Sequence, residues 1–179
     1  MDIALLLFLI LLNGVLAMSE IAVVSSRQSR LKKLADDGSV GARSALALHH
    51  EPATFLSTVQ VGITTVGILS GAIGEATLAA PMARWLSTHP SLAPYASGIA
   101  MTLVVIIVTY FSVVIGELVP KRLGLLAPER VASLIARPMN LLARLARPLV
   151  WLLSSSSSLL LGLLSSELHK LAAEGIPVW

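Results

Sequence analysis

Three long apolar stretches dominate the pattern of hydrophobic and polar positions along the chain. They cover residues 3–26, 53–80 and 98–120, and each is long enough for a membrane-spanning helix, which needs about 20 apolar residues. Residues 29–51, between the first two stretches, are polar but carry leucines at helical spacing, which predicts a short amphipathic juxtamembrane helix. The pattern therefore predicts an all-α membrane protein with three transmembrane helices per subunit.

Beyond the third apolar stretch the pattern changes. Arg130, Arg137 and Arg144 recur every seven residues, so they share one helix face, while aliphatic residues fill the others. This predicts an amphipathic belt helix over about 128–164 that lies in the inner membrane interface and extends its arginines toward lipid headgroups. A fourth span over 149–164 stays open, but the belt is favoured because a fourth span would leave charged residues outside.

The basic residues predict the orientation of these helices. One cluster, within 27–33, follows the first apolar stretch, and Lys121 and Arg122 follow the third. By the positive-inside rule, both lie on the cytoplasmic side, so the N-terminus is outside and the C-terminus inside a multi-pass cytoplasmic (inner) membrane protein. A cleaved signal peptide is disfavoured because no basic residue precedes the first stretch.

Composition narrows the possible functions. The chain is 55% hydrophobic and 13% charged, whereas soluble domains are about 25% charged, so a soluble globular enzyme is disfavoured. It has no cysteine, which excludes thiolate metal sites and cysteine nucleophiles. No phosphate-binding loop or dinucleotide motif is present, so we expect no enzyme. The flanking charges account for the net charge of +3, and no nucleic-acid partner is expected.

Three carboxylates, Glu20, Glu75 and Glu117, lie within apolar stretches. Burial of a carboxylate in a membrane costs several kcal/mol unless it is paired, protonated or bound to a cation. Glu117 has Lys121 four residues later, so a plain ion pair within one helix is one explanation.

The segment around Glu117 also carries a proline. Pro120 has no backbone N–H, so the carbonyl of Gly116 loses its helical partner and is expected to face an ion beside the Glu117 carboxylate. In this interpretation Lys121 pairs with Glu117 when the site is empty and moves away when a divalent ion binds.

The second apolar stretch contains four glycines with hydroxyl residues between them. One interpretation is a packing face, which we expect at the interface of a homodimer formed by the second and third helices. The other is a helix that unwinds around 62–71 and offers carbonyl oxygens, or the hydroxyl of Ser70, to an ion.

Hydroxyl, carbonyl and carboxylate oxygens are the ligands of hard cations such as magnesium, calcium or sodium. The candidate ligands of the principal metal site are Glu117, Gly116, Ser70, Gly67 and Ser25. The candidates for a secondary or sodium site are Asn13, Ser19, Glu20 and Gly62. Pro120 and Lys121 are expected to act in structure or gating.

Three segments resemble one known family. They are 19–27 (SEIAVVSSR), 57–71 (STVQVGIT through SG), and 116–122 (GELVPKR) with its continuation APERVA at 127–132. Together they resemble the transmembrane domain of the CorC/cyclin M (CNNM) family, and the likeness extends from the first helix to the belt.

The resemblance implies a homodimeric exporter of Mg²⁺ driven by an inward Na⁺ gradient, with dehydrated Mg²⁺ bound among oxygen ligands of the three helices. It also implies nucleotide-binding cytosolic CBS domains, which are absent from residues 1–179 and expected only in a longer chain. Two alternatives remain: a membrane anchor and dimerisation module for such cytosolic domains, or a passive cation channel.

Overall fold

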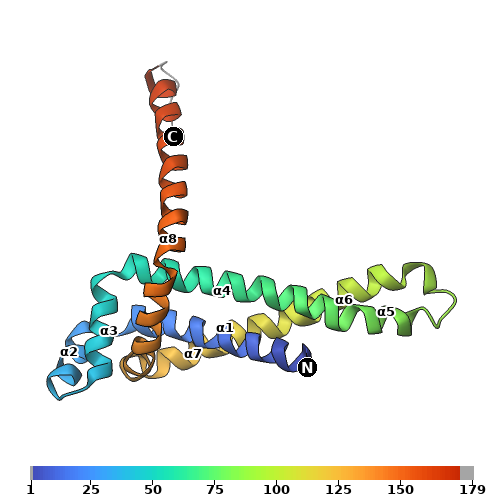
Figure 1. Cartoon of the computed structure of the whole chain (residues 1–179), viewed down its shortest axis with the longest axis horizontal. Coiled ribbons are helices and arrows are strands. Elements are labelled where there is room, and N and C mark those ends of the chain that lie inside the picture. The colour runs from blue at the N-terminus through green and yellow to red at the C-terminus, as the bar shows by residue number, and fades with distance from the viewer. Residues whose placement is uncertain (1, 174–179) are drawn as a thin grey trace.

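The computed structural model describes residues 2–173 of the chain, with side chains as far as residue 162. Three helical rods lie side by side along the long axis of the molecule (Figure 1). The first rod is α1 (Asp2–Ser25). The second is α4 (Pro52–Gly74), continued by the π-helix η1 (Glu75–Ala79) and α5 (Ala80–Leu86). The third is α6 (Ala96–Val113), continued by η3 (Val114–Leu118, also a π-helix) and α7 (Val119–Leu126).

Each rod is long and apolar enough to cross a membrane, so the prediction of three long apolar helices is confirmed for the described residues. The second and third rods extend beyond their predicted bounds, to Leu86 and from Ala93 to Leu126, where the 3₁₀ turn η2 (Ala93–Tyr95) leads into α6. At 35 and 34 residues these rods are roughly 50 Å long. They therefore exceed a hydrocarbon layer of about 30 Å.

The two π-helices explain how the long rods continue past proline. Each π element ends two residues before a proline, Pro81 after η1 and Pro120 after η3. A proline lacks the N–H and clashes with the carbonyl four residues earlier, and a wider turn relieves that clash. In η3 the N–H of Val119 donates to the carbonyl of Val114, five residues back.

The expectation that the second helix unwinds around 62–71 is wrong. α4 is an unbroken α-helix from Pro52 to Gly74, and the change of helical geometry comes only at η1. An unbroken helix satisfies its backbone groups within the segment, so these glycines leave no carbonyl of α4 free for an ion. The glycines of α4 therefore either allow close packing or lie on an open face of the helix, and they do not expose backbone carbonyls.

The juxtamembrane segment forms two helices in place of the single expected helix over 29–51. They are α2 (Gln28–Asp36) and α3 (Val40–His50). Between them Gly38 has a φ of 95°, a conformation that favours glycine. The Ser39 hydroxyl then caps α3 by accepting the N–H of Ala42 at 3.2 Å.

The belt segment is a single helix, α8 (Pro128–Ala173), which continues through Pro138 and Pro148. Figure 1 shows α8 running crosswise to the three rods, at the end where α1 meets α2 and α7 ends. α8 therefore does not run alongside the three rods as a fourth parallel helix. Its first half packs on α1, α3 and α4.

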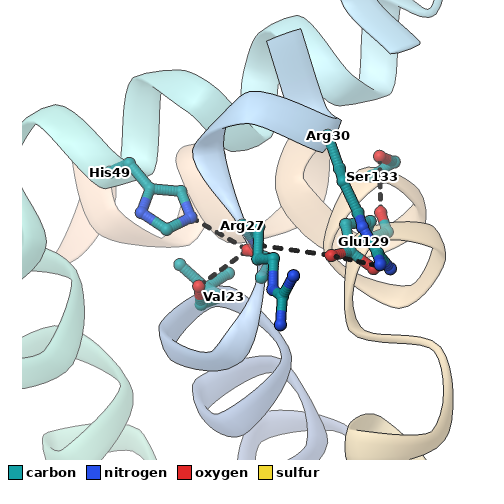
Figure 2. Close-up of polar contacts among 7 residues, drawn as sticks. Val23, Arg27, Arg30, His49, Glu129 and Ser133 are labelled. Atoms are coloured by element: carbon teal, nitrogen blue, oxygen red, sulfur yellow. Dashed lines mark hydrogen bonds and ion pairs between the residues drawn. The ribbon is translucent and has the colours of Figure 1, made fainter. Parts of the chain in front are cut away.

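A polar junction holds α8 to the start of the juxtamembrane helices (Figure 2). The Glu129 carboxylate accepts the backbone N–H of Arg27 at 3.4 Å and lies 3.8 Å from the Arg30 guanidinium. On the other side of the junction, the Ser26 hydroxyl donates to the carbonyl of Val23 at 2.8 Å. It therefore accepts the Nε2–H of His49 at 2.9 Å.

Gly124 marks the closest approach of α7 to α1. A Cβ at this position would lie 2.7 Å from Ile21 Cγ2 and 3.0 Å from the carbonyl oxygen of Met18. We predict that Gly124→Ala lowers the free energy of unfolding by about 1–3 kcal/mol through overpacking. Gly98→Ala is the matched control, since its Cβ meets nothing within 4 Å. Thermal unfolding in detergent, followed by tryptophan fluorescence, tests this, and equal midpoints for the two variants would contradict the packing.

His49 gives the junction a dependence on pH. Burial, and then the neighbouring charge of His50, lower the pKa of His49. The unfolded chain, where a histidine pKa is about 6.5, therefore binds more protons than the folded chain, and stability falls as pH drops below that value. We predict that His49→Gln, which keeps a donor for Ser26, reduces the decline of the thermal midpoint between pH 7.5 and 5.5. His89→Gln, in an exposed loop, serves as control and should show the decline of the parent.

Candidate functional site

The candidate site lies along the seam between α1 and the π-helix η3. Gly116 is buried there, and a Cβ on it would lie 3.2 Å from the carbonyl oxygen of Ile10. The Nδ2 of Asn13 donates to the carbonyl of Gly116 at 3.1 Å. The Gly116 carbonyl was expected to be free to face an ion. It instead accepts a hydrogen bond from α1, because the close approach of the two backbones brings Asn13 within reach.

The side-chain oxygen of Asn13, in contrast, has no such partner. Asn13 is buried, and its Oδ1 has no hydrogen-bond partner among the described residues. An unsatisfied buried acceptor costs about 1–3 kcal/mol. In the reverse orientation of the amide, Asn13 Oδ1 would face the carbonyl oxygen of Gly116, and neither oxygen can donate a hydrogen bond. The hydrogen bond to Gly116 therefore fixes Oδ1 as the unpaired atom. A cation is one group that would satisfy it.

A charged cluster lies further along the same seam. The ammonium of Lys121 donates to Glu117 Oε1 at 2.8 Å and lies 3.4 Å from Glu20 Oε2. The predicted pairing of Lys121 with Glu117 is thus present. The contact with Glu20 is an ion pair without hydrogen-bond geometry, since Glu20 Oε2 is buried and accepts no hydrogen bond.

We call Glu20, Glu117 and Lys121 the carboxylate cradle. Its side chains are 23%, 39% and 33% exposed, in that order. Two carboxylates and one ammonium carry one net negative formal charge. Removing the ammonium would leave two carboxylates from different helices facing the same space, an arrangement that favours a bound cation.

Glu20 is the residue whose role in this cluster was missed. Glu20 was expected in a secondary or sodium site with Asn13 rather than beside Glu117. Spacing within α1 gives no information on which residue of the third rod lies opposite. The register of α1 against α7, set by Gly124 and Gly116, brings Glu20 to Lys121.

The other predicted ligands are spread along the seam and over α4. Ser25 lies twelve residues beyond Asn13 on α1, roughly 18 Å along the helix axis, and is not brought to Gly116. Ser19 is fully buried and donates to the carbonyl of Leu16 at 2.6 Å. Ser70 is also buried and donates to the carbonyl of Val66 at 2.8 Å.

The two glycines among the predicted ligands differ in their surroundings. Gly62 packs against Leu16 of α1, where a Cβ would lie 3.1 Å from a leucine methyl. Gly67 is exposed, and a Cβ there would meet nothing within 4 Å. Gly67 therefore faces outward from this chain rather than into the seam.

Within the described part of the chain, no three His, Asp or Glu side chains come close enough to hold a metal ion. A cation at the cradle would therefore have two carboxylates and would need amide, hydroxyl, carbonyl or water oxygens for its remaining ligands. Such a donor set suits hard cations and organic ammonium groups.

Three apolar rods, each long and apolar enough to cross a membrane, with the carboxylate cradle on their seam, define a helical transmembrane domain. Residues 4–174 match the Cyclin M transmembrane N-terminal domain, CNNM, and the chain belongs to that family. The resemblance found in the sequence is therefore confirmed. The family is one of membrane transporters and not of enzymes.

Relatives support this assignment. The chain is 47% identical over 173 residues to a UPF0053 protein of Synechocystis, covering 95% of this chain and 39% of that protein. It is 34% identical over 150 residues to a protein of Salmonella typhimurium named polyamine export protein, covering 84% and 33%. The protein of that name in Escherichia coli K12 is 33% identical over 159 residues, covering 89% and 35%. The chain thus spans about two fifths or less of the length of these relatives.

The cradle predicts how the chain responds to loss of the ammonium. Lys121→Met keeps the apolar stem but leaves Glu20 and Glu117 without their counter-charge, so we expect the variant to lose about 1–2 kcal/mol of stability in EDTA. Millimolar Mg²⁺ should restore much of this loss by binding the folded state. Thermal unfolding with and without Mg²⁺ measures both effects.

Arg122→Met is the matched control, because Arg122 is exposed and adjacent in sequence. It should behave like the parent in EDTA and in Mg²⁺. A Lys121→Met variant as stable as the parent, and indifferent to Mg²⁺, would show that the cradle holds no cation.

Proposed function

We propose that this domain exports Mg²⁺ across the cytoplasmic membrane, driven by an inward Na⁺ gradient. The single observation that supports this best is the carboxylate cradle, in which two carboxylates from different rods share one tethered cation at 2.8 and 3.4 Å. The Lys121 ammonium occupies the position that a transported cation would take. Entry of Mg²⁺ displaces it, and its return helps to release the ion.

The proposed Mg²⁺ site centres on Glu117, with Glu20 as a second carboxylate and the neighbouring carbonyl of Gly116. Rotation of Asn13 away from Gly116 would free that carbonyl for the ion. Ser70, Gly67 and Ser25 stay as predicted ligands that would have to approach in another conformation. One or two carboxylates bind Mg²⁺ weakly enough for release, as transport requires.

For Na⁺ we propose Asn13, whose buried Oδ1 lacks a hydrogen-bond partner, with Ser19 and Glu20 further along the same helix. Asn13 and Glu20 are two helical turns apart and lie on one face of α1. Because Glu20 belongs to both groups, Na⁺ and Mg²⁺ would compete for the same carboxylate. Such competition couples the two ions without a separate pathway.

Polyamines are the second candidate substrate. The relatives from Salmonella typhimurium and Escherichia coli are named polyamine export proteins, and the cradle already holds a primary alkylammonium group, that of Lys121. A linear polyamine would place one of its ammonium groups there. Unlike Mg²⁺, it needs hydrogen-bond acceptors rather than a complete coordination shell.

We also propose that the domain works as a homodimer with its N-terminus outside and its C-terminus inside. Gly67 and Gly71 lie on an open face of α4 with nothing within 4 Å, whereas Gly62 and Gly74 pack inside the subunit. Glu75 is exposed toward one end of the same rod. A lipid-facing carboxylate is costly, so a second subunit on this face would shield it.

Glu117 is the residue that the proposal needs most. We predict that Glu117→Gln and Glu117→Ala each weaken Mg²⁺ binding at least tenfold and abolish Na⁺-dependent Mg²⁺ efflux. The reason is that the remaining carboxylate, Glu20, is neutralised by Lys121. Binding is measured by calorimetry in detergent, and efflux from proteoliposomes with and without a Na⁺ gradient. Asp36→Asn is the matched control, since it removes an exposed carboxylate of α2 that lies outside the cradle and the proposed dimer face.

The same proteoliposomes separate the alternatives. If the parent exported spermidine in place of Mg²⁺, and the Glu117 variants lost this efflux equally, the transported substrate would be a polyamine. Mg²⁺ flux without a Na⁺ requirement would indicate a passive channel, and no flux of either cation would indicate a membrane anchor. Variants that bind and export Mg²⁺ like the parent would refute the proposed role of Glu117.

A further inference from the structure

The first half of α8 has two distinct faces. One face is buried against the other helices and contributes Ala132, Ile135, Ala136 and Met139 to the main hydrophobic core. The opposite face is open, yet it carries three leucines that are 79%, 60% and 70% exposed: Leu134, Leu141 and Leu145. A water-facing helix surface seldom presents such a row of leucines.

Arginines lie beside these leucines on the same face. Arg130, Arg137 and Arg144 recur at two-turn intervals and are exposed. No ion pair joins any of the three to another residue in the described part of the chain. The open face of α8 therefore combines unpaired guanidinium groups with apolar side chains, which is the composition of a helix that contacts phospholipid.

A groove marks one place on this face where a headgroup would fit. It has a volume of about 600 Å³ and lies between α8 and the turn that joins α2 to α3. Its lining includes Leu34, Val40, Arg130, Ser133, Leu134 and Arg137, and no carboxylate. The groove thus has two cations for an anionic group and three aliphatic side chains for the chain attached to it.

The position of α8 indicates how deep the groove lies in the membrane. α8 starts where the third rod ends and runs crosswise to the rods (Figure 1), and Glu129 ties its first turn to the end of α1. With the membrane orientation proposed above, this level is the cytoplasmic interface. Leucines there reach the acyl region while arginines extend to the phosphates.

We infer that this groove binds the headgroup of an anionic glycerophospholipid. Arg130 and Arg137 contact the phosphate, and Leu134 contacts the start of an acyl chain. A free phosphate compound would use the arginines but gain nothing from the leucine. The inference rests on the proposed orientation of the domain in the membrane but not on which cation it transports.

The test is native mass spectrometry of the full chain in detergent, titrated with phosphatidylglycerol or phosphatidylcholine. The parent should retain phosphatidylglycerol in preference to phosphatidylcholine. Because each arginine near a membrane surface contributes about a factor of five to anionic lipid binding, the double variant R130Q/R137Q should bind phosphatidylglycerol roughly 30-fold more weakly. R84Q, which changes an exposed arginine in α5, is the matched control and should bind like the parent.

Two further measurements distinguish binding of the lipid from binding of a free phosphate compound. Leu134→Gln should weaken phosphatidylglycerol binding without changing any binding of glycerol 3-phosphate. Equal retention of both lipids, unchanged binding by R130Q/R137Q, or displacement of phosphatidylglycerol by equimolar glycerol 3-phosphate would overturn the inference. Thermal midpoints of the variants confirm that they are folded. Since no Mg²⁺ or Na⁺ gradient is present, the outcome is independent of the transport assay.

Discussion

The contact of Lys121 with both Glu117 and Glu20 is the interaction on which the arrangement of the seam depends. It joins the first rod to the third and offsets one of the two carboxylate charges there. Without the ammonium, two partly exposed carboxylates would face each other without a counter-charge, at a cost of about 1–2 kcal/mol. Close packing at Gly116 and Gly124 makes the contact possible, because larger residues there would separate the helices.

The π-helices connect this charge arrangement to the backbone. Pro120 cannot donate to the carbonyl of Gly116, and η3 widens the helix just before it. The carbonyl then accepts from Asn13 of the first rod, at the cost of leaving Asn13 Oδ1 unsatisfied. The unpaired acceptor and the π-helical turn thus lie at the same place on the seam, and π-helical turns occur frequently at functional sites.

Much of the fold is predictable from the sequence because the apolar stretches alone require three spans. The ends of the rods are less predictable: the second apolar stretch ends at residue 80, just before Pro81, whereas η1 lets the helix continue to Leu86. The division of 29–51 into two helices depends on one residue, Gly38, whose positive φ has no signature in hydrophobic spacing. Glu117 and Lys121 were predictable as a pair because they share one helix.

Contacts between helices are what the sequence leaves undetermined. Glu20 joins the cradle only because α1 lies parallel to α7 in a register that hydrophobicity does not encode, since a shift by one helical turn would keep the same apolar faces together. Small residues fix that register by shape: Gly116 meets Ile10 and Gly124 meets Met18 and Ile21. Charge then selects among the registers that shape allows, because only one brings Lys121 between two carboxylates. A transported cation that replaced the ammonium would keep this register while freeing Lys121, so ion exchange at the cradle would proceed without separating the helices.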